Sequence, residues 1–212
     1  MPISFPAYDN CPKELAIIGK MLAAYGDMEF DLMNCVSAVH STDMAVKALY
    51  RPRGESARVD IADAMAREAY IAAGLETPYC EAIGNFRYCL SVRNQYAHCN
   101  WFWRSDIGLG FVDMQVMANK KKHLSLTSLA VYPLDLLLLE AQEEYFAYVQ
   151  ECFRYLTNAY ARKVGKPVIY DYPKPSRVQQ PIQHRPEIQP SRQTPEIHDD
   201  TPDREPTPVY GK

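Results

Sequence analysis

The sequence predicts a mainly α-helical protein, an up-and-down helical bundle with a small β-hairpin insertion and a disordered, Pro-rich C-terminal tail. Two observations support this fold class. Between residues 13 and 165, apolar residues recur at steps of three, four and seven, which places them on one face of each helix. Beyond residue 166 this pattern stops, and ten of the sixteen prolines lie there. The chain therefore divides into an extended lead-in (1–12), one helical domain (13–165) and a tail (166–212).

The composition suits one globular domain and excludes several classes of site. A length of 212 residues allows a sizeable core. The net charge of −3 gives no global signal for nucleic acid, so any RNA contact has to come from a local patch. The six cysteines include no Cys-x-x-Cys pair, which indicates free thiols rather than a zinc site or a disulfide framework. We therefore expect no metal and no cofactor.

Targeting and membrane segments are not expected either. The N-terminus lacks a basic segment followed by an apolar core, which is the pattern of a signal peptide. No stretch reaches the 18 or so apolar residues that a membrane-spanning helix needs. These features predict a cytoplasmic protein without a membrane partner.

The first half of the domain is predicted to form three helices. They cover about residues 13–40, 42–50 and 56–73. Pro12 suits the first turn of the first helix, because its missing N–H would have no partner there. The segment Arg51–Gly54 breaks the chain between the second and third helices, since Pro52 restricts the residue before it and Gly54 frees the backbone.

A fourth helix, over about 78–101, carries polar residues where a buried face is expected. Its apolar face comprises Ile83, Phe86, Leu90 and Ala97. A polar stripe with helical spacing invades that face and comprises Arg87, Ser91, Asn94 and His98. An unpaired buried polar group costs roughly 1–3 kcal/mol. These groups are therefore satisfied by one another, face a cleft or face a partner.

Arg93, Asn94 and His98 have the residue types and spacing for RNA cleavage by the 2′-hydroxyl. A histidine moves a proton near neutral pH, and an arginine fork stabilises charge on phosphate oxygens. Asn94 lies on the same side of the helix as His98 and could orient its imidazole or bind a phosphate oxygen. Arg93 and His98 lie about 140° apart, so one helix makes a poor site, whereas two copies around a two-fold axis would pool them. The plain alternative is a His that complements the helix dipole and a solvated Arg.

The run Arg93-Asn94-x-x-x-His98, near the end of the penultimate long helix, resembles the HEPN superfamily. Its signature is Arg-x4-6-His, often with Asn, Asp or His directly after the Arg. The resemblance covers roughly Lys13 to Val164, but its specific part is six residues. It implies a metal-independent endoribonuclease of the toxin–antitoxin or anti-phage kind, with Arg93, Asn94 and His98 of two protomers meeting in one site. It also implies a homodimer, an RNA substrate and, in a toxin setting, a cognate antitoxin protein. Some members of that superfamily act as binding modules without nuclease activity.

A β-hairpin is predicted over about 107–131, before the last helix. Residues 107–116 and 123–131 show partial alternation, and the segment between them contains Lys120, Lys121 and Lys122. These lysines could guide a phosphate backbone, as could Arg87 and Ser91 of the polar stripe, or they could be a solvated turn that protects a sheet edge. Trp101 and Trp103 could stack RNA bases, although they could equally fill the core beside the helix end.

The last helix is predicted from about 133 to 163, with its acidic residues near the N-terminal end, where the helix dipole favours them. The tail from 166 to 212 has few large apolar residues. Such a composition cannot bury enough surface to offset the cost of ordering, so the sequence predicts a disordered or polyproline-like tail.

Three hypotheses follow from the sequence. The first is a dimeric, metal-independent endoribonuclease. The second is a non-catalytic helical module that binds RNA, a nucleotide or a protein partner through the polar stripe. The third is a purely structural or interaction protein in which the motif arises by chance. No Gly-rich phosphate loop, Ser/His/Asp order or carboxylate cluster favours another class of enzyme.

Overall fold

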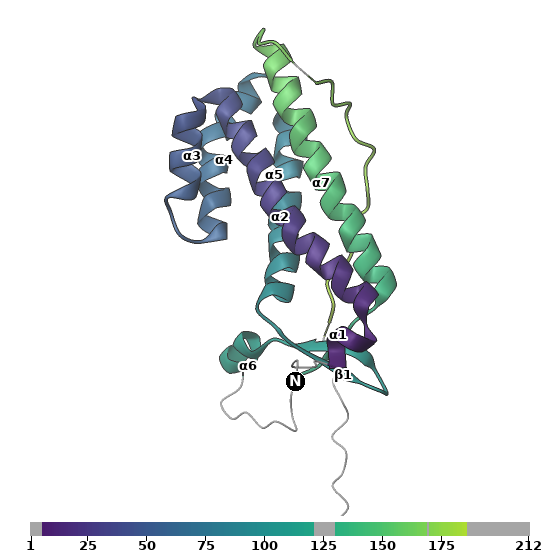
Figure 1. Cartoon of the computed structure of the whole chain (residues 1–212). Coiled ribbons are helices and arrows are strands. Elements are labelled where there is room, and N and C mark those ends of the chain that lie inside the picture. The colour runs from purple at the N-terminus through teal and green to yellow at the C-terminus, as the bar shows by residue number, and fades with distance from the viewer. Residues whose placement is uncertain (1–5, 121–129, 169, 186–212) are drawn as a thin grey trace, which may run out of the picture.

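The computed structural model describes residues 6–120, 130–168 and 170–185. It is mainly helical, with a small antiparallel sheet at one end of the helices (Figure 1). The four long helices are α2 (Pro12–Val39), α4 (Glu55–Ala72), α5 (Glu76–Ala97) and α7 (Leu136–Lys163). The short helices are α1 (Pro6–Asn10), α3 (Thr42–Tyr50) and α6 (Met114–Lys120).

The helices before the motif helix agree with the sequence prediction to within one residue at each end. Helix α2 begins at Pro12, as its lack of an N–H favours. The hydroxyl of Ser41 accepts a hydrogen bond from the Met44 amide and so caps α3. Gly54 has a φ of 101° in the turn before α4, a conformation that other residues avoid. The lead-in differs from the prediction, because residues 6–10 form α1, in which Ala7 is buried.

The core lies between α2, α5 and α7. Helix α2 packs against α7 along its length, while α4 packs against α5 and, with α3, covers the other side of α2. The aromatic rings of Phe86 and Phe153 meet edge to face at 5.5 Å in the middle of this core, and Tyr25 packs against Phe86 at the same ring separation. Within the described residues, no helix is long and apolar enough to span a membrane.

The motif helix ends earlier than the sequence predicts. Helix α5 stops at Ala97 rather than near Trp101, and His98 is its C-terminal cap. The reason is that Trp101 and Trp103 belong to the strand β1 (Asn100–Arg104), where aromatic residues are favoured. Trp101 packs against Tyr96 and Phe111, which is the core role, whereas Trp103 is partly exposed.

The predicted hairpin is correct only in part, because residues 108–112 of its first strand do form a strand, but their main partner lies before residue 107. Strand β1 pairs with β2 (Gly108–Val112) through a turn at 105–107, and β2 pairs with the short β3 (Tyr132–Pro133), so the sheet order is β1-β2-β3. Residues 114–120 form α6, because the segment Met-Gln-Val-Met-Ala-Asn-Lys is rich in good helix formers that outweigh the weak alternation. The predicted second strand, 123–131, falls mostly within 121–129, outside the described residues.

The first part of the predicted disordered tail instead lies on the helices. Residues 170–185, here called the strap, run as extended chain back along α7 toward the sheet (Figure 1). The Ile182 carbonyl accepts hydrogen bonds from Gln142 and Tyr88, and the His184 carbonyl accepts one from Gln95. Composition alone missed these contacts because a few backbone and side-chain hydrogen bonds hold the strap, without a large apolar face. Residues 186–212 lie outside the described residues.

The imidazole of His184 anchors the end of the strap. It is buried, its Nε2 accepts the Asp135 amide at 3.1 Å, and its Nδ1 lies 2.8 Å from the Tyr96 hydroxyl. The Tyr96 hydroxyl donates its proton to Gln142 at 2.5 Å, so it accepts a hydrogen bond from the N–H at Nδ1 of His184. The network is complete only when the imidazole is neutral.

We expect the strap to loosen as the pH falls below 6.5. Burial lowers the pKa of His184 from its ordinary value of 6.5, an effect that the nearby Asp135 opposes. A histidine with a lowered folded-state pKa contributes stability that is full above the unfolded value and is lost as the pH falls, because protonation then favours the open state. The loosening of the strap is measured by amide hydrogen exchange over residues 178–185, corrected for the intrinsic exchange rate at each pH. Exchange that does not depend on pH, or that keeps its pH dependence in His184→Ala, would contradict the expectation.

Candidate functional site

Arg93 is held by a carboxylate that the sequence analysis did not identify. Glu55, the first residue of α4, forms a bidentate ion pair with the Arg93 guanidinium. Nη2 of Arg93 lies 2.9 Å from Oε1 of Glu55, and Nη1 lies 3.0 Å from Oε2. The two side chains are 23% and 29% exposed, so solvent reaches the pair. Nη1 also donates to Oδ1 of Asn94 at 3.0 Å. Arg93, Asn94 and Glu55 therefore form one polar cluster at the contact between α4 and α5.

Behind this cluster the helices bury an aromatic ring and a second ion pair. The Arg93 guanidinium lies 5.7 Å from the centre of the Tyr25 ring, a cation–π arrangement. Burial raises the pKa of Tyr25, and the carboxylates of Glu29 and Glu55 raise it further. Arg58 of α4 forms an ion pair with Glu29 of α2. Helices α2, α4 and α5 are thus joined through charged groups on the inner side of Arg93.

His98 lies apart from this cluster, at the end of α5. Its backbone amide donates to the Asn94 carbonyl at 3.3 Å, which closes the last turn of the helix. The residue is exposed, and within the described residues its imidazole has no hydrogen bond. The imidazole is therefore accessible from solvent.

The structure brings Arg93 and Asn94 together and leaves His98 without a hydrogen bond to either side chain. The absence of a hydrogen bond between Arg93 and His98 agrees with their angular separation of about 140° around one helix. In a single chain, a phosphate would meet an accessible imidazole and an arginine fork that a carboxylate already occupies. A carboxylate and a phosphate engage an arginine fork through the same bidentate geometry, so the two would compete.

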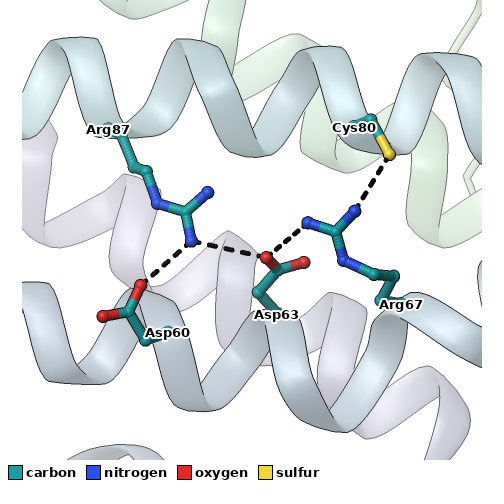
Figure 2. A network of polar contacts seen from close by, with 5 residues as sticks. All are labelled: Asp60, Asp63, Arg67, Cys80 and Arg87. Carbon is teal, nitrogen blue, oxygen red and sulfur yellow. Dashed lines mark hydrogen bonds and ion pairs between the residues drawn. The ribbon is translucent and has the colours of Figure 1, made fainter.

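Arg87 and Ser91, the other predicted contacts on α5, make bonds within the chain. Nη2 of Arg87 donates to Asp60 at 2.9 Å and to Asp63 at 3.3 Å, and Asp63 also holds Arg67 at 2.6 Å (Figure 2). These ion pairs fasten α5 to α4. Ser91 donates to the Tyr88 carbonyl and accepts from Gln183 of the strap.

The predicted lysine run lies at the edge of what the structure describes. Lys120 is the last residue of α6, and Lys121 and Lys122 lie outside the described residues. Among the described residues, no group of three or more His, Cys, Asp or Glu side chains could hold a metal ion.

A cavity beside α5 does not involve the motif. It measures about 390 Å³, lies between α5, α7 and the strap, and is lined by residues that include Glu81, Asn85, Tyr148 and Arg177. Asn85 precedes Arg93 by eight residues, or about 12 Å along a helix axis. The cavity is therefore separate from the Arg93 cluster.

No family model, no curated protein and no solved structure matches the chain.

Proposed function

We propose that the chain is a metal-independent endoribonuclease that works as a homodimer of HEPN-like helical bundles. The observation that supports this most is the end of α5, where the accessible imidazole of His98 follows the Arg93–Asn94 pair by one helical turn. The proposal includes a cytoplasmic setting, an RNA substrate, and a role in a toxin–antitoxin or anti-phage system with a cognate antitoxin.

The reaction is transesterification at a phosphodiester. The 2′-oxygen attacks the adjacent phosphorus as its proton passes to a base, and the bond to the 5′-oxygen breaks as that oxygen gains a proton. His98 moves a proton in this scheme. Arg93 stabilises the charge on the phosphorane oxygens through its fork, and Asn94 positions Arg93. The products are a 2′,3′-cyclic phosphate and a 5′-hydroxyl.

A dimer supplies the second imidazole and the facing arginine that one chain lacks. Two proton transfers need two groups or one group that acts twice, and one α5 offers a single imidazole turned away from its arginine. Two α5 ends related by a two-fold axis would face each other with two copies of each residue.

The composite site is tested by mixing two variants. We expect His98→Ala and Arg93→Ala each to be inactive alone in EDTA, and a mixture refolded or co-expressed to regain part of the wild-type activity. The mixed dimer keeps one imidazole and one arginine. The measurement is the formation of a 2′,3′-cyclic phosphate from a labelled RNA, with the mass in solution determined in parallel. If the protein is monomeric, or if the mixture stays inactive while each variant is dimeric, the pooled site is wrong.

A specific observation also favours a non-catalytic binding module. The bidentate contact with Glu55 leaves Arg93 less available to a phosphate. In that case the polar end of α5 would bind RNA or a protein without cleaving it. RNA binding with no cleavage of any RNA tried, in EDTA or with metal, would favour the module.

Glu55→Gln tests whether the carboxylate competes with RNA. We expect the variant to bind single-stranded RNA about threefold more tightly at low salt, because one negative charge beside Arg93 is removed. Fluorescence anisotropy in EDTA measures the affinity. Asp43→Asn is a matched control, since Asp43 forms an exposed ion pair with Lys47 on α3 and its loss gives the same change in net charge. Equal tightening in both variants would mean a general effect of charge and not competition at Arg93.

A further inference from the structure

The turn between α3 and α4 carries two arginines without acidic partners. In the described part of the chain, ten lysine and arginine side chains form ion pairs with Asp or Glu. The side chains of Arg51 and Arg53 are exposed, and they differ from these ten because neither has a hydrogen bond or ion pair within the described residues. Two unneutralised guanidinium groups two residues apart make a local positive charge on a chain whose net charge is −3.

The turn that carries these arginines is fixed to the bundle on both sides. Before the turn, Nε of Arg58 donates to the Leu49 carbonyl at 2.9 Å, and its guanidinium lies 5.0 Å from the centre of the Tyr50 ring. Arg58 is itself held by Glu29 of α2. After the turn, Glu55 binds Arg93 of α5. The backbone of the turn therefore has a defined place beside the motif helix.

The chain places Arg53 close to the candidate site. Arg53 precedes Glu55 by two residues, so their Cα atoms lie within about 7 Å of each other. Figure 1 shows the turn at the end of the α3–α4 pair that is nearer the sheet, the same direction in which α5 runs toward His98. From Arg93 to His98 the helix rises by about 7.5 Å. The turn thus lies beyond Glu55 in the direction in which α5 runs from Arg93 to His98.

We propose that the α3–α4 turn, through Arg51 and Arg53, binds the phosphates of single-stranded RNA that flank the position held at Arg93 and His98. The inference deepens the proposed function and rests on it for the identity of the ligand. Guanidinium groups bind phosphate oxygens bidentately, and arginines on a braced turn lose less freedom on binding than arginines on a mobile one. The sequence pattern of Arg51–Gly54 indicates only a break between helices.

The test measures RNA binding without cleavage. A fluorescein-labelled single-stranded RNA of mixed sequence is titrated in EDTA with the full-length His98→Ala chain, alone and with Arg51→Ala/Arg53→Ala added. We expect the added pair to weaken binding about tenfold near 0.1 M salt and to reduce the slope of log K against log salt by about 1.4, since each phosphate contact contributes about 0.7. Arg51→Lys/Arg53→Lys keeps both charges and retains most of the slope.

The matched control is Lys174→Ala/Arg177→Ala, which removes two exposed positive charges from the strap. It changes the net charge by the same amount, and we expect the slope to stay unchanged. If both double variants lose affinity equally, or if adding Arg51→Ala/Arg53→Ala leaves the affinity of the His98→Ala chain unchanged, the proposal that the turn binds phosphates is overturned. Circular dichroism confirms that each variant is folded.

The two proposals fail separately. If the wild-type chain does not cleave RNA but Arg51 and Arg53 still set the salt slope, the ribonuclease proposal falls and the phosphate-binding turn stands. If the wild-type chain cleaves RNA and the Arg51→Ala/Arg53→Ala variant binds and cleaves RNA normally, the proposal for the turn is wrong and the ribonuclease proposal is retained. If the His98→Ala chain binds no RNA at low salt, the turn is overturned, and the cleavage assay on the wild-type chain still decides the ribonuclease proposal.

Discussion

Replacing His98 with alanine is expected to lower the rate of RNA cleavage by at least about a hundredfold, since general acid–base catalysis contributes about 10²–10⁴. The imidazole is exposed and has no hydrogen bond within the described residues, so its removal leaves no buried group without a partner. We therefore expect the midpoint of urea unfolding to stay the same. The measurement is the single-turnover cleavage rate of a labelled RNA in EDTA.

Two controls separate the role of His98 from a loss of structure. His40→Ala removes another imidazole. His40 follows the C-terminal end of α2, its imidazole hydrogen-bonds to the carbonyl of Met65 on α4 at 2.9 Å, and it has no place in the candidate site. We expect this variant to lose some stability and to keep its cleavage rate once it is folded. If His98→Ala cleaves RNA as fast as the wild-type chain, His98 has no catalytic role and the ribonuclease proposal loses its central residue.

Replacing Phe153 with alanine is expected to give the largest loss of stability, about 3–5 kcal/mol. The ring is fully buried on α7 and meets Phe86 of α5 edge to face. Its removal leaves a cavity where α2, α5 and α7 converge, and the surrounding helices can close it only in part. Urea unfolding followed by circular dichroism measures the change in the free energy of unfolding.

Leu137→Ala is the matched control on the same helix. The Leu137 side chain is 74% exposed, so we expect a change within about 0.5 kcal/mol. A loss for Phe153→Ala of less than about 1 kcal/mol would mean that α7 does not pack on α5 through this ring. Retained cleavage activity in the folded fraction of Phe153→Ala would show that the ring supports the fold and not the chemistry.

The helices of the bundle were predictable because each one depends on local rules. Pro12 marks the start of α2, and the apolar spacing of α5 selects the face on which Phe86 and Leu90 are buried. The sheet was located only in part. Strand β2 lies within the predicted 107–116, but β1 is formed by aromatic residues that the apolar spacing assigns to the end of the motif helix.

The strap shows that composition alone does not predict which segments of the tail are ordered. A Pro-rich segment without large apolar residues predicts disorder, yet His184 is buried 88 residues away from its partner Tyr96. One histidine with a donor on one ring nitrogen and an acceptor on the other satisfies a polar pocket that no local pattern reveals. Hydrogen bonds between distant segments decide such a contact.

The sequence by itself determined the helical class, the long helices and the presence of Arg93, Asn94 and His98 on one of them. These properties follow from the 3.6-residue period and from residue types, which act over a few residues. Only the tertiary structure decided that Glu55, 38 residues earlier, occupies the fork of Arg93, which brings the turn before α4 next to the motif helix. The packing of α4 on α5 brings these groups together, because contacts between distant segments depend on how the helices dock and not on the pattern within either one.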